Sequence, residues 1–216
     1  MPDIHSEIEA ANVVLVGGFN PRIFQPAWFA NHGLLRPEEA ELAENLVSTR
    51  EVTTFATKWL TIQVIPERFQ AFTMDAAHFE ALRDLVLGTF ALLEHTPLEG
   101  MGINREFHIK MPSRDRYIRI GHLLVPKEPW RDLLEDPVTR SVTVSGLQKR
   151  GDHQPTLQVK VEPSNRVESG IFVSTNEHYQ LKQNDPPKML MMALREHWNE
   201  AMGAATRVAA HLLQLT

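Results

Sequence analysis

The histidines are the first residues of this chain that could do metal or acid–base chemistry. There are ten histidines and no cysteine. A helical zinc motif places two histidines three or four residues apart on one face, and no two histidines here have that spacing. Glu106 and His108 are two residues apart in a segment with strand character, so they would share a face. We predict no metal site, and Glu106 with His108 is the candidate centre for a hydrolase or a metal-dependent enzyme.

The other motifs that carry catalysis or bind a nucleotide are incomplete. Gly17 and Gly18 follow an apolar run, but the Lys-Ser/Thr of a phosphate-binding loop does not follow them. The sequence around Ser145 lacks the first glycine of a nucleophile elbow. His178 and His197 each stand beside a glutamate and are expected to be ordinary hydrogen-bonded histidines. We therefore predict no catalytic residue and no cofactor.

Charge is distributed unevenly along the chain, whose formal net charge is -5. Residues 1–100 hold 14 acids and 6 bases, a balance of -8, and residues 151–216 hold 7 acids and 6 bases, a balance of -1. Residues 101–150 hold 6 acids and 10 bases, a balance of +4. This basic segment has two interpretations. It is a solvated face that pairs with the acidic first half, or it is a surface for an anionic partner.

The candidate interaction residues come from the basic segment and from the C-terminal helix. Arg116 and Arg119 share a face if their segment is helical. Met191 and Met192 lie to the sides of the apolar stripe expected for a helix over 187–215, and methionine adapts to irregular partner surfaces. The complete set of predicted interaction residues is Arg105, Lys110, Arg114, Arg116, Arg119, Lys127, Trp130, Arg131, Met191 and Met192.

The pattern of apolar residues predicts both strands and helices. Between 100 and 111 the odd positions are apolar, and Arg105 is the exception on that face. Ser113 can cap a short helix that ends at Leu124. The other expected strands are 12–18, two in 52–74, 141–147, 156–161 and 170–179; the other expected helices are 37–46, 76–94 and 187–215.

Strands cluster in this sequence without regular alternation with helices, which predicts an α+β fold of antiparallel sheet covered by helices. The length suits one domain over residues 1–216. The strands in 52–74 with the helix 76–94 resemble the strands in 156–179 with the helix 187–215. This similarity suggests two pseudo-repeated halves built of strands and a covering helix, at 1–125 and 126–216.

The sequence contains no run of about 18 apolar residues, so no membrane span is expected. Its first residues lack the basic segment and apolar stretch of a signal peptide. The cytoplasm is therefore the expected compartment, with no membrane partner.

Three segments carry a resemblance to a known group of proteins. They are WLTIQV with ERF in 59–69, GINREFH in 102–108 and GHLLVPKEPW in 121–130. Together they resemble a sporadically distributed family of uncharacterised bacterial proteins, with likeness over about residues 50–180. The resemblance implies a bacterial cytoplasmic protein. It supplies no activity and no catalytic residues, and its patchy distribution is typical of accessory, mobile or defence-associated genes.

These observations lead to three functional hypotheses. The first is a non-catalytic protein that binds another protein, encoded nearby, as an antitoxin, immunity or accessory subunit of a bacterial assembly; a homo-oligomer is compatible with it. The second is nucleic-acid binding through the basic segment 105–131, with arginines on phosphates and aromatic rings on bases. The third is the hydrolase centred on Glu106 and His108.

Overall fold

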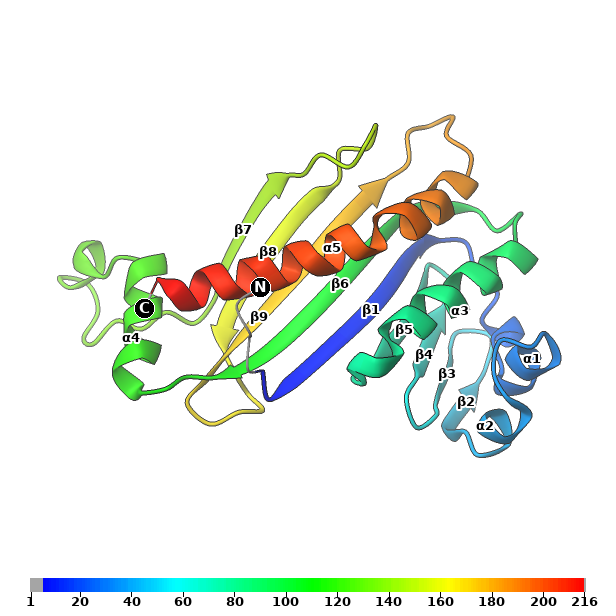
Figure 1. Cartoon of the computed structure of the whole chain (residues 1–216), viewed down its shortest axis with the longest axis horizontal. Coiled ribbons are helices and arrows are strands. Elements are labelled where there is room, and N and C mark those ends of the chain that lie inside the picture. The colour runs from blue at the N-terminus through cyan, green and yellow to red at the C-terminus, as the bar shows by residue number, and fades with distance from the viewer. Residues whose placement is uncertain (1–5, 216) are drawn as a thin grey trace.

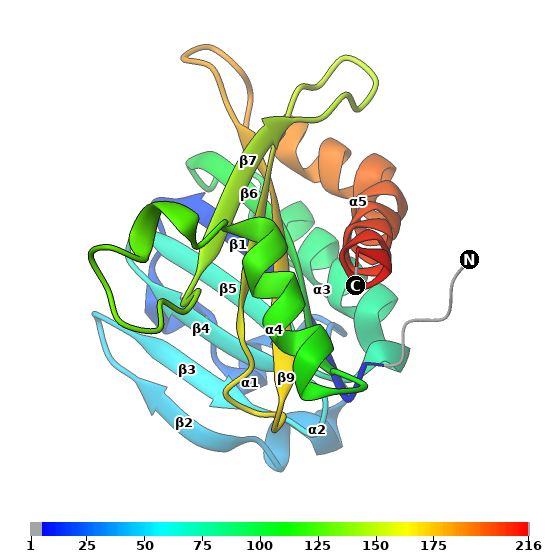
Figure 2. The ribbon, with the colours of Figure 1, turned by 90° about the vertical axis from the view of Figure 1, so that its left-hand side faces the viewer.

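One antiparallel sheet of nine strands runs through the molecule, and helices cover one of its faces (Figures 1 and 2). This architecture comes from a computed structural model that describes residues 6–215. The first five residues, which include part of the segment expected not to be a signal peptide, lie outside the described range. The strand order is β2-β3-β4-β5-β1-β6-β9-β8-β7. The predicted α+β class, an antiparallel sheet covered by helices, is confirmed.

The elements follow one another as strands and helices of very different lengths. The strands are β1 (Ile8–Gly17), β2 (Glu44–Ser48), β3 (Thr53–Ala56), β4 (Thr61–Ile65), β5 (Arg68–Thr73), β6 (Leu98–Lys110), β7 (Val142–Leu147), β8 (Thr156–Pro163) and β9 (Gly170–Gln180). The α-helices are α1 (Pro26–Asn31), α2 (Pro37–Glu41), α3 (Phe79–Leu92), α4 (Arg114–Leu124) and α5 (Lys188–Gln214). Short 3-10 turns are η1 (Pro21–Ile23), η2 (Ala76–His78) and η3 (Glu128–Trp130).

The topology repeats itself about the middle of the sheet. Strand β1 precedes short helices, a meander of strands and the covering helix α3; strand β6 likewise precedes α4, η3, the strands β7 to β9 and the covering helix α5. β1 and β6 pair antiparallel at the centre, β5 lies beside β1 and β9 lies beside β6. The topological repeat thus begins at Leu98, earlier than the expected division between residues 125 and 126.

Alternation along the central strands decides which face the helices cover. The buried residues Leu15 on β1 and Met101 on β6 belong to a large apolar core with α1, α3 and the first part of α5. Phe107 on β6 belongs to a smaller core with α4 and the last part of α5. Because side chains alternate between faces, the even-numbered residues of these two strands, such as Asn12 and Asn104, point to the other face of the sheet.

One predicted helix is wrong in its second half. The segment 37–46 was expected to be helical throughout, but α2 ends at Glu41 and β2 begins at Glu44. Asn45 has a φ of 56°, a left-handed conformation that asparagine tolerates better than most residues and that a right-handed helix does not allow. The expected hairpin in 52–74 and the helix from Ser113 to Leu124 are confirmed. None of the described helices combines the length and apolar content needed to cross a bilayer.

Candidate functional site

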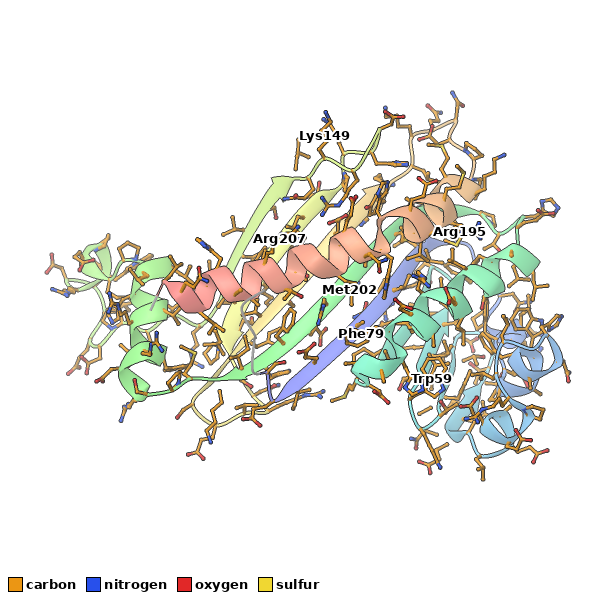
Figure 3. All side chains as sticks on the ribbon, viewed as in Figure 1. Trp59, Phe79, Lys149, Arg195, Met202 and Arg207 are labelled. Atoms are coloured by element: carbon orange, nitrogen blue, oxygen red, sulfur yellow. The ribbon has the colours of Figure 1, made fainter. Side chains whose placement is uncertain are left out.

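The side chain of Arg105 is largely buried by contacts within the molecule, so the prediction that it belongs to an outward contact surface is wrong. As an odd-numbered residue of β6 it points toward α5. Its Nη2 lies 2.6 Å from Oε2 of Glu9, and its Nη1 donates hydrogen bonds to the carbonyl oxygen of Met202 at 3.3 Å and to Oγ1 of Thr206 at 3.0 Å. Figure 3 labels Met202 on α5, which supplies this carbonyl group.

The guanidinium of Arg105 also lies between two aromatic rings. It is 5.3 Å from the ring centroid of Phe79 and 4.8 Å from that of Phe107, and these two rings belong to the larger and the smaller core. Stacking on aromatic faces suits the planar guanidinium and stabilises its charge away from water. Arg105 therefore joins the two cores and is not available to a partner.

Lys127 is also internal, which corrects a second predicted contact residue. Its side chain is 4% exposed, and its Nζ donates to the carbonyl oxygens of Val125 at 2.8 Å and Gly121 at 3.3 Å and to the hydroxyl of Thr139. Burial lowers the pKa of the Lys127 ammonium, while Glu128 nearby raises it. Lys127 caps the last carbonyl groups of α4 and fastens the segment before β7 to them.

The other cations among the predicted contact residues lie at the surface. Arg114, Arg116 and Arg119 project from α4, and Lys110 ends β6. Arg131 is exposed beside Trp130 and lies 3.6 Å from Glu128. Within residues 6–215 the three arginines of α4 and Arg140 take part in no ion pair. No acidic side chain among the described residues therefore neutralises their charge by direct contact.

Exposed apolar side chains gather in the same part of the chain. Of the sixteen large apolar side chains that are exposed among the described residues, eight lie between Ile118 and Leu147. Leu133 and Val138 are each 74% exposed, and Trp130 is 46% exposed. The eight are Ile118, Leu123, Trp130, Leu133, Leu134, Val138, Val144 and Leu147. Exposed apolar side chains concentrated in one region are typical of a surface that another molecule covers.

A cavity connects α4 with the start of β7. Its volume is about 310 Å³, and its mostly apolar lining includes Ile118 of α4, Val138, Val142 of β7 and Ile171 of β9. Arg140 and Lys127 also line it. We call this region the α4–β7 surface: the cavity, the cations Arg114, Arg116, Arg119, Arg131 and Arg140, and seven of the eight exposed apolar residues. The eighth, Leu147, is left out because alternation along β7 places its side chain on the opposite face from Val142 and Val144.

Met191 and Met192 do not extend this surface. Met191 packs partly buried against the larger core, while Met192 is 51% exposed near the start of α5. The last part of α5 contacts α4, where Ala209 and Ile120 share the smaller core. With 1.5 Å of rise per residue, Met192 is about 25 Å from that contact along the helix axis. Figure 1 shows α4 at one end of the molecule and the start of α5 toward the other.

Glu106 and His108 share a face, as their spacing predicts, but they do not form an open catalytic centre. His108 is 5% exposed; its Nδ1 lies 2.8 Å from Oγ of Ser164, and its ring lies 4.8 Å from the ring of Phe172. Burial raises the pKa of Glu106 and lowers that of His108, and the charge of Arg166 lowers both. No three histidine, aspartate or glutamate side chains of residues 6–215 are placed to hold a metal ion.

A buried polar cluster, which the sequence did not single out as a unit, lies between β9, α5 and the loop after β7. Arg150 contacts Glu177 through two hydrogen bonds, Nε to Oε1 at 3.0 Å and Nη2 to Oε2 at 2.7 Å. Tyr179 donates its hydroxyl proton to the same carboxylate at 2.7 Å, and burial raises the pKa of Tyr179 far above its usual value. His197 is buried beside the ring of Tyr179. Because the charges are paired inside the protein, the cluster fastens the loop to the sheet.

The sheet face opposite the helices is a second uncovered surface. The register places four amides, Gln158, Asn176, Asn104 and Asn12, in one row across β8, β9, β6 and β1. Nδ2 of Asn104 donates to Oδ1 of Asn12 at 2.6 Å. The row is uncharged, so it lacks the electrostatic attraction that the arginines give the α4–β7 surface.

Sequence reasoning missed the apolar half of the α4–β7 surface. Leu133 and Leu134 stand among Asp132, Glu135 and Asp136 in a segment without helical or strand periodicity. Apolar residues in such a segment have no helix or strand that could bury them. Their presence in a segment without periodicity is the sequence signal that could have predicted their exposure.

Comparison with known proteins adds no assignment to this geometry. No family model matches the chain, and no curated protein sequence is significantly similar to it. The fold and the surface define an α+β protein with exposed cationic and apolar side chains concentrated around α4 and the segment that leads into β7.

Proposed function

We propose that this chain is a non-catalytic binding protein whose α4–β7 surface docks an acidic, apolar-containing segment of another protein. The observation that carries the proposal is that seven of the sixteen described exposed large apolar side chains lie in the same region as four arginines, Arg114, Arg116, Arg119 and Arg140, that form no ion pair with another described residue. An apolar centre with a charged rim is the usual anatomy of a protein interface. The partner would be an assembly component encoded nearby, with this chain as its antitoxin, immunity or accessory subunit.

The charge on the surface determines the kind of partner segment. Arg114, Arg116 and Arg119 along α4 favour carboxylates, and the cavity next to Val138 and Val142 accepts apolar side chains. Nucleic acid is supported less well, since two of the cations in 105–131, Arg105 and Lys127, are internal.

A selection experiment tests this proposal without knowledge of the natural partner. The full chain is immobilised and a display library of random peptides of about twelve residues is selected on it. We expect enriched peptides to combine Asp and Glu with apolar residues. The Arg116→Ala, Arg119→Ala variant should bind them about five- to tenfold more weakly, since two exposed charge contacts contribute about 1 kcal/mol together.

The matched control is Arg22→Ala with Arg50→Ala, because both arginines are exposed and belong to the first half of the chain. This control should bind the selected peptides as the native chain does. Selection of basic peptides, or equal weakening by both pairs of substitutions, would contradict the proposal. Preference for duplex DNA over every selected peptide at the same salt concentration would instead support the nucleic-acid hypothesis.

A further inference from the structure

The strand at the end of the sheet next to α4 has an uncovered edge. β7 is the last strand in the sheet order, and it pairs with β8 on one side only. All six of its residues pair in continuous register, from Val142 with Val161 to Leu147 with Thr156. Five of the six are exposed, and Val144 is 62% exposed.

β7 also lacks the features that usually protect an edge strand. Natural edge strands carry charges, prolines or bulges that prevent another strand from pairing. The segment Val142–Leu147 contains no charge and no proline, and its register with β8 contains no bulge. The opposite edge differs: β2 has an irregular register between Glu44 and Val47, and Asn45 within it has a positive φ. Only the β7 edge is therefore well formed for pairing.

The register also identifies the backbone groups that are free at this edge. Gln148 donates its amide proton to the carbonyl oxygen of Pro155 at 2.9 Å, so Gln148 belongs to the residues whose backbone groups face β8. In an antiparallel pair this orientation alternates along the strand. The amide groups of Thr143, Ser145 and Leu147 therefore point away from β8 and into solvent.

We propose that the partner segment of the α4–β7 surface binds as an added strand on β7. This inference rests on the proposed function and specifies how the segment binds. The added strand would hydrogen-bond to Thr143, Ser145 and Leu147, the usual mode of strand addition to a sheet edge. Every second side chain would lie beside Val142 and Val144, on the helix-covered side and next to the cavity.

Charge complementarity makes the occupant an acidic segment and not a second copy of this chain's β7. Arg140 precedes β7, and Lys149 follows it in the loop labelled in Figure 3. Two antiparallel copies of β7 would bring these like charges together, whereas a segment with carboxylates would pair with them.

The probe is a synthetic peptide of about ten residues that alternates valine with glutamate, with a valine–lysine peptide as its charge-reversed match. We expect the glutamate peptide to bind the full chain and the lysine peptide not to bind. Residue-resolved hydrogen exchange by NMR should show the amides of Thr143, Ser145 and Leu147 protected in the complex. The amides of Val142 and Val144, which already face β8, should change much less.

The variant Ser145→Pro removes one outward amide donor and leaves the bonds to β8 in place, because proline is tolerated at the solvent side of an edge strand. It should weaken the glutamate peptide at least about tenfold. The control Ser48→Pro changes the opposite edge strand β2, and should leave binding unchanged. Far-ultraviolet circular dichroism and the urea midpoint establish that both variants fold.

Three outcomes would overturn strand addition. Binding without new protection at Thr143, Ser145 and Leu147 would leave the proposed function standing and refute the added strand. A native chain that sediments as a dimer, which Ser145→Pro dissociates, would assign the edge to a second copy. Absence of binding by the glutamate peptide at millimolar concentration would also refute strand addition, while the library selection would still decide the proposed function separately.

Discussion

The contact between Arg150 and Glu177 should be one of the costliest in the protein to break. Glu177 is 1% exposed, and its carboxylate oxygens accept two hydrogen bonds from Arg150 and one from Tyr179. In Arg150→Met the carboxylate keeps only the Tyr179 hydroxyl and remains buried. Removing one partner of such a pair costs about 3–5 kcal/mol, a large fraction of the 5–15 kcal/mol typical for the unfolding of a whole protein.

Urea denaturation at pH 7, followed by circular dichroism, measures this cost. The variant Arg150→Met with Glu177→Gln provides the decisive comparison, because it removes the cation and the unpaired charge together. It should recover at least about half of the lost free energy of unfolding. A loss below about 1 kcal/mol for Arg150→Met, or the same loss for the single and the double variant, would refute the view that uncompensated buried charge causes the effect.

Two further predictions concern the first half of the chain. Hydrogen bonding to Arg36 lowers the pKa of Glu39 to about 2. A depressed carboxyl pKa stabilises the fold above pH 4.5 and loses this effect as the pH falls toward 2. Because the Arg36 side chain is exposed to solvent, Glu39→Gln should destabilise by only about 1 kcal/mol at pH 6 and by almost nothing at pH 2. A difference in unfolding free energy between the native chain and Glu39→Gln that stays constant from pH 6 to pH 2 would contradict this pH dependence. In Gly17→Ala the new Cβ would lie 2.1 Å from the carbonyl oxygen of Pro97, while at Gly146 no atom lies within 4 Å. Gly17→Ala should therefore lose about 1–3 kcal/mol in urea denaturation and Gly146→Ala almost nothing, and equal losses would count against the packing at Gly17.

Sequence periodicity predicted the elements with long, regular patterns. The alternation of 100–111 corresponds to β6, and the apolar stripe of 187–215 corresponds to α5. The pattern around β2 failed: Glu and Ala favour helix locally, but α2 ends at Glu41, and Asn45 within β2 has a left-handed φ that a continued helix would not allow. Strand order was beyond reach, since it depends on pairing between residues far apart in the chain. β1 and β6, at the centre of the sheet, are separated by about 90 positions.

The candidate site was predicted in part. Exposure of the arginines on α4 follows from their spacing in an amphipathic helix, but Arg105 already stood on the apolar face of its strand, and that position indicated burial. Lys127 gave no such signal, because its partners are backbone oxygens of α4 and the hydroxyl of Thr139, twelve residues away. A list of cations from sequence therefore mixes surface residues with internal ones until a structure separates them.

Chemical-shift mapping by NMR tests the central claim most directly. The tightest acidic peptide from the library selection is titrated into the isotope-labelled chain, and every backbone amide is followed. If the peptide binds at the α4–β7 surface, we expect saturable chemical-shift changes concentrated in residues 114–147. In the Arg116→Ala and Arg119→Ala variants the peptide should cause no such changes around positions 116 and 119. Shifts centred on the amide row of Asn12, Asn104 and Asn176, or at the start of α5 around Met192, would contradict it.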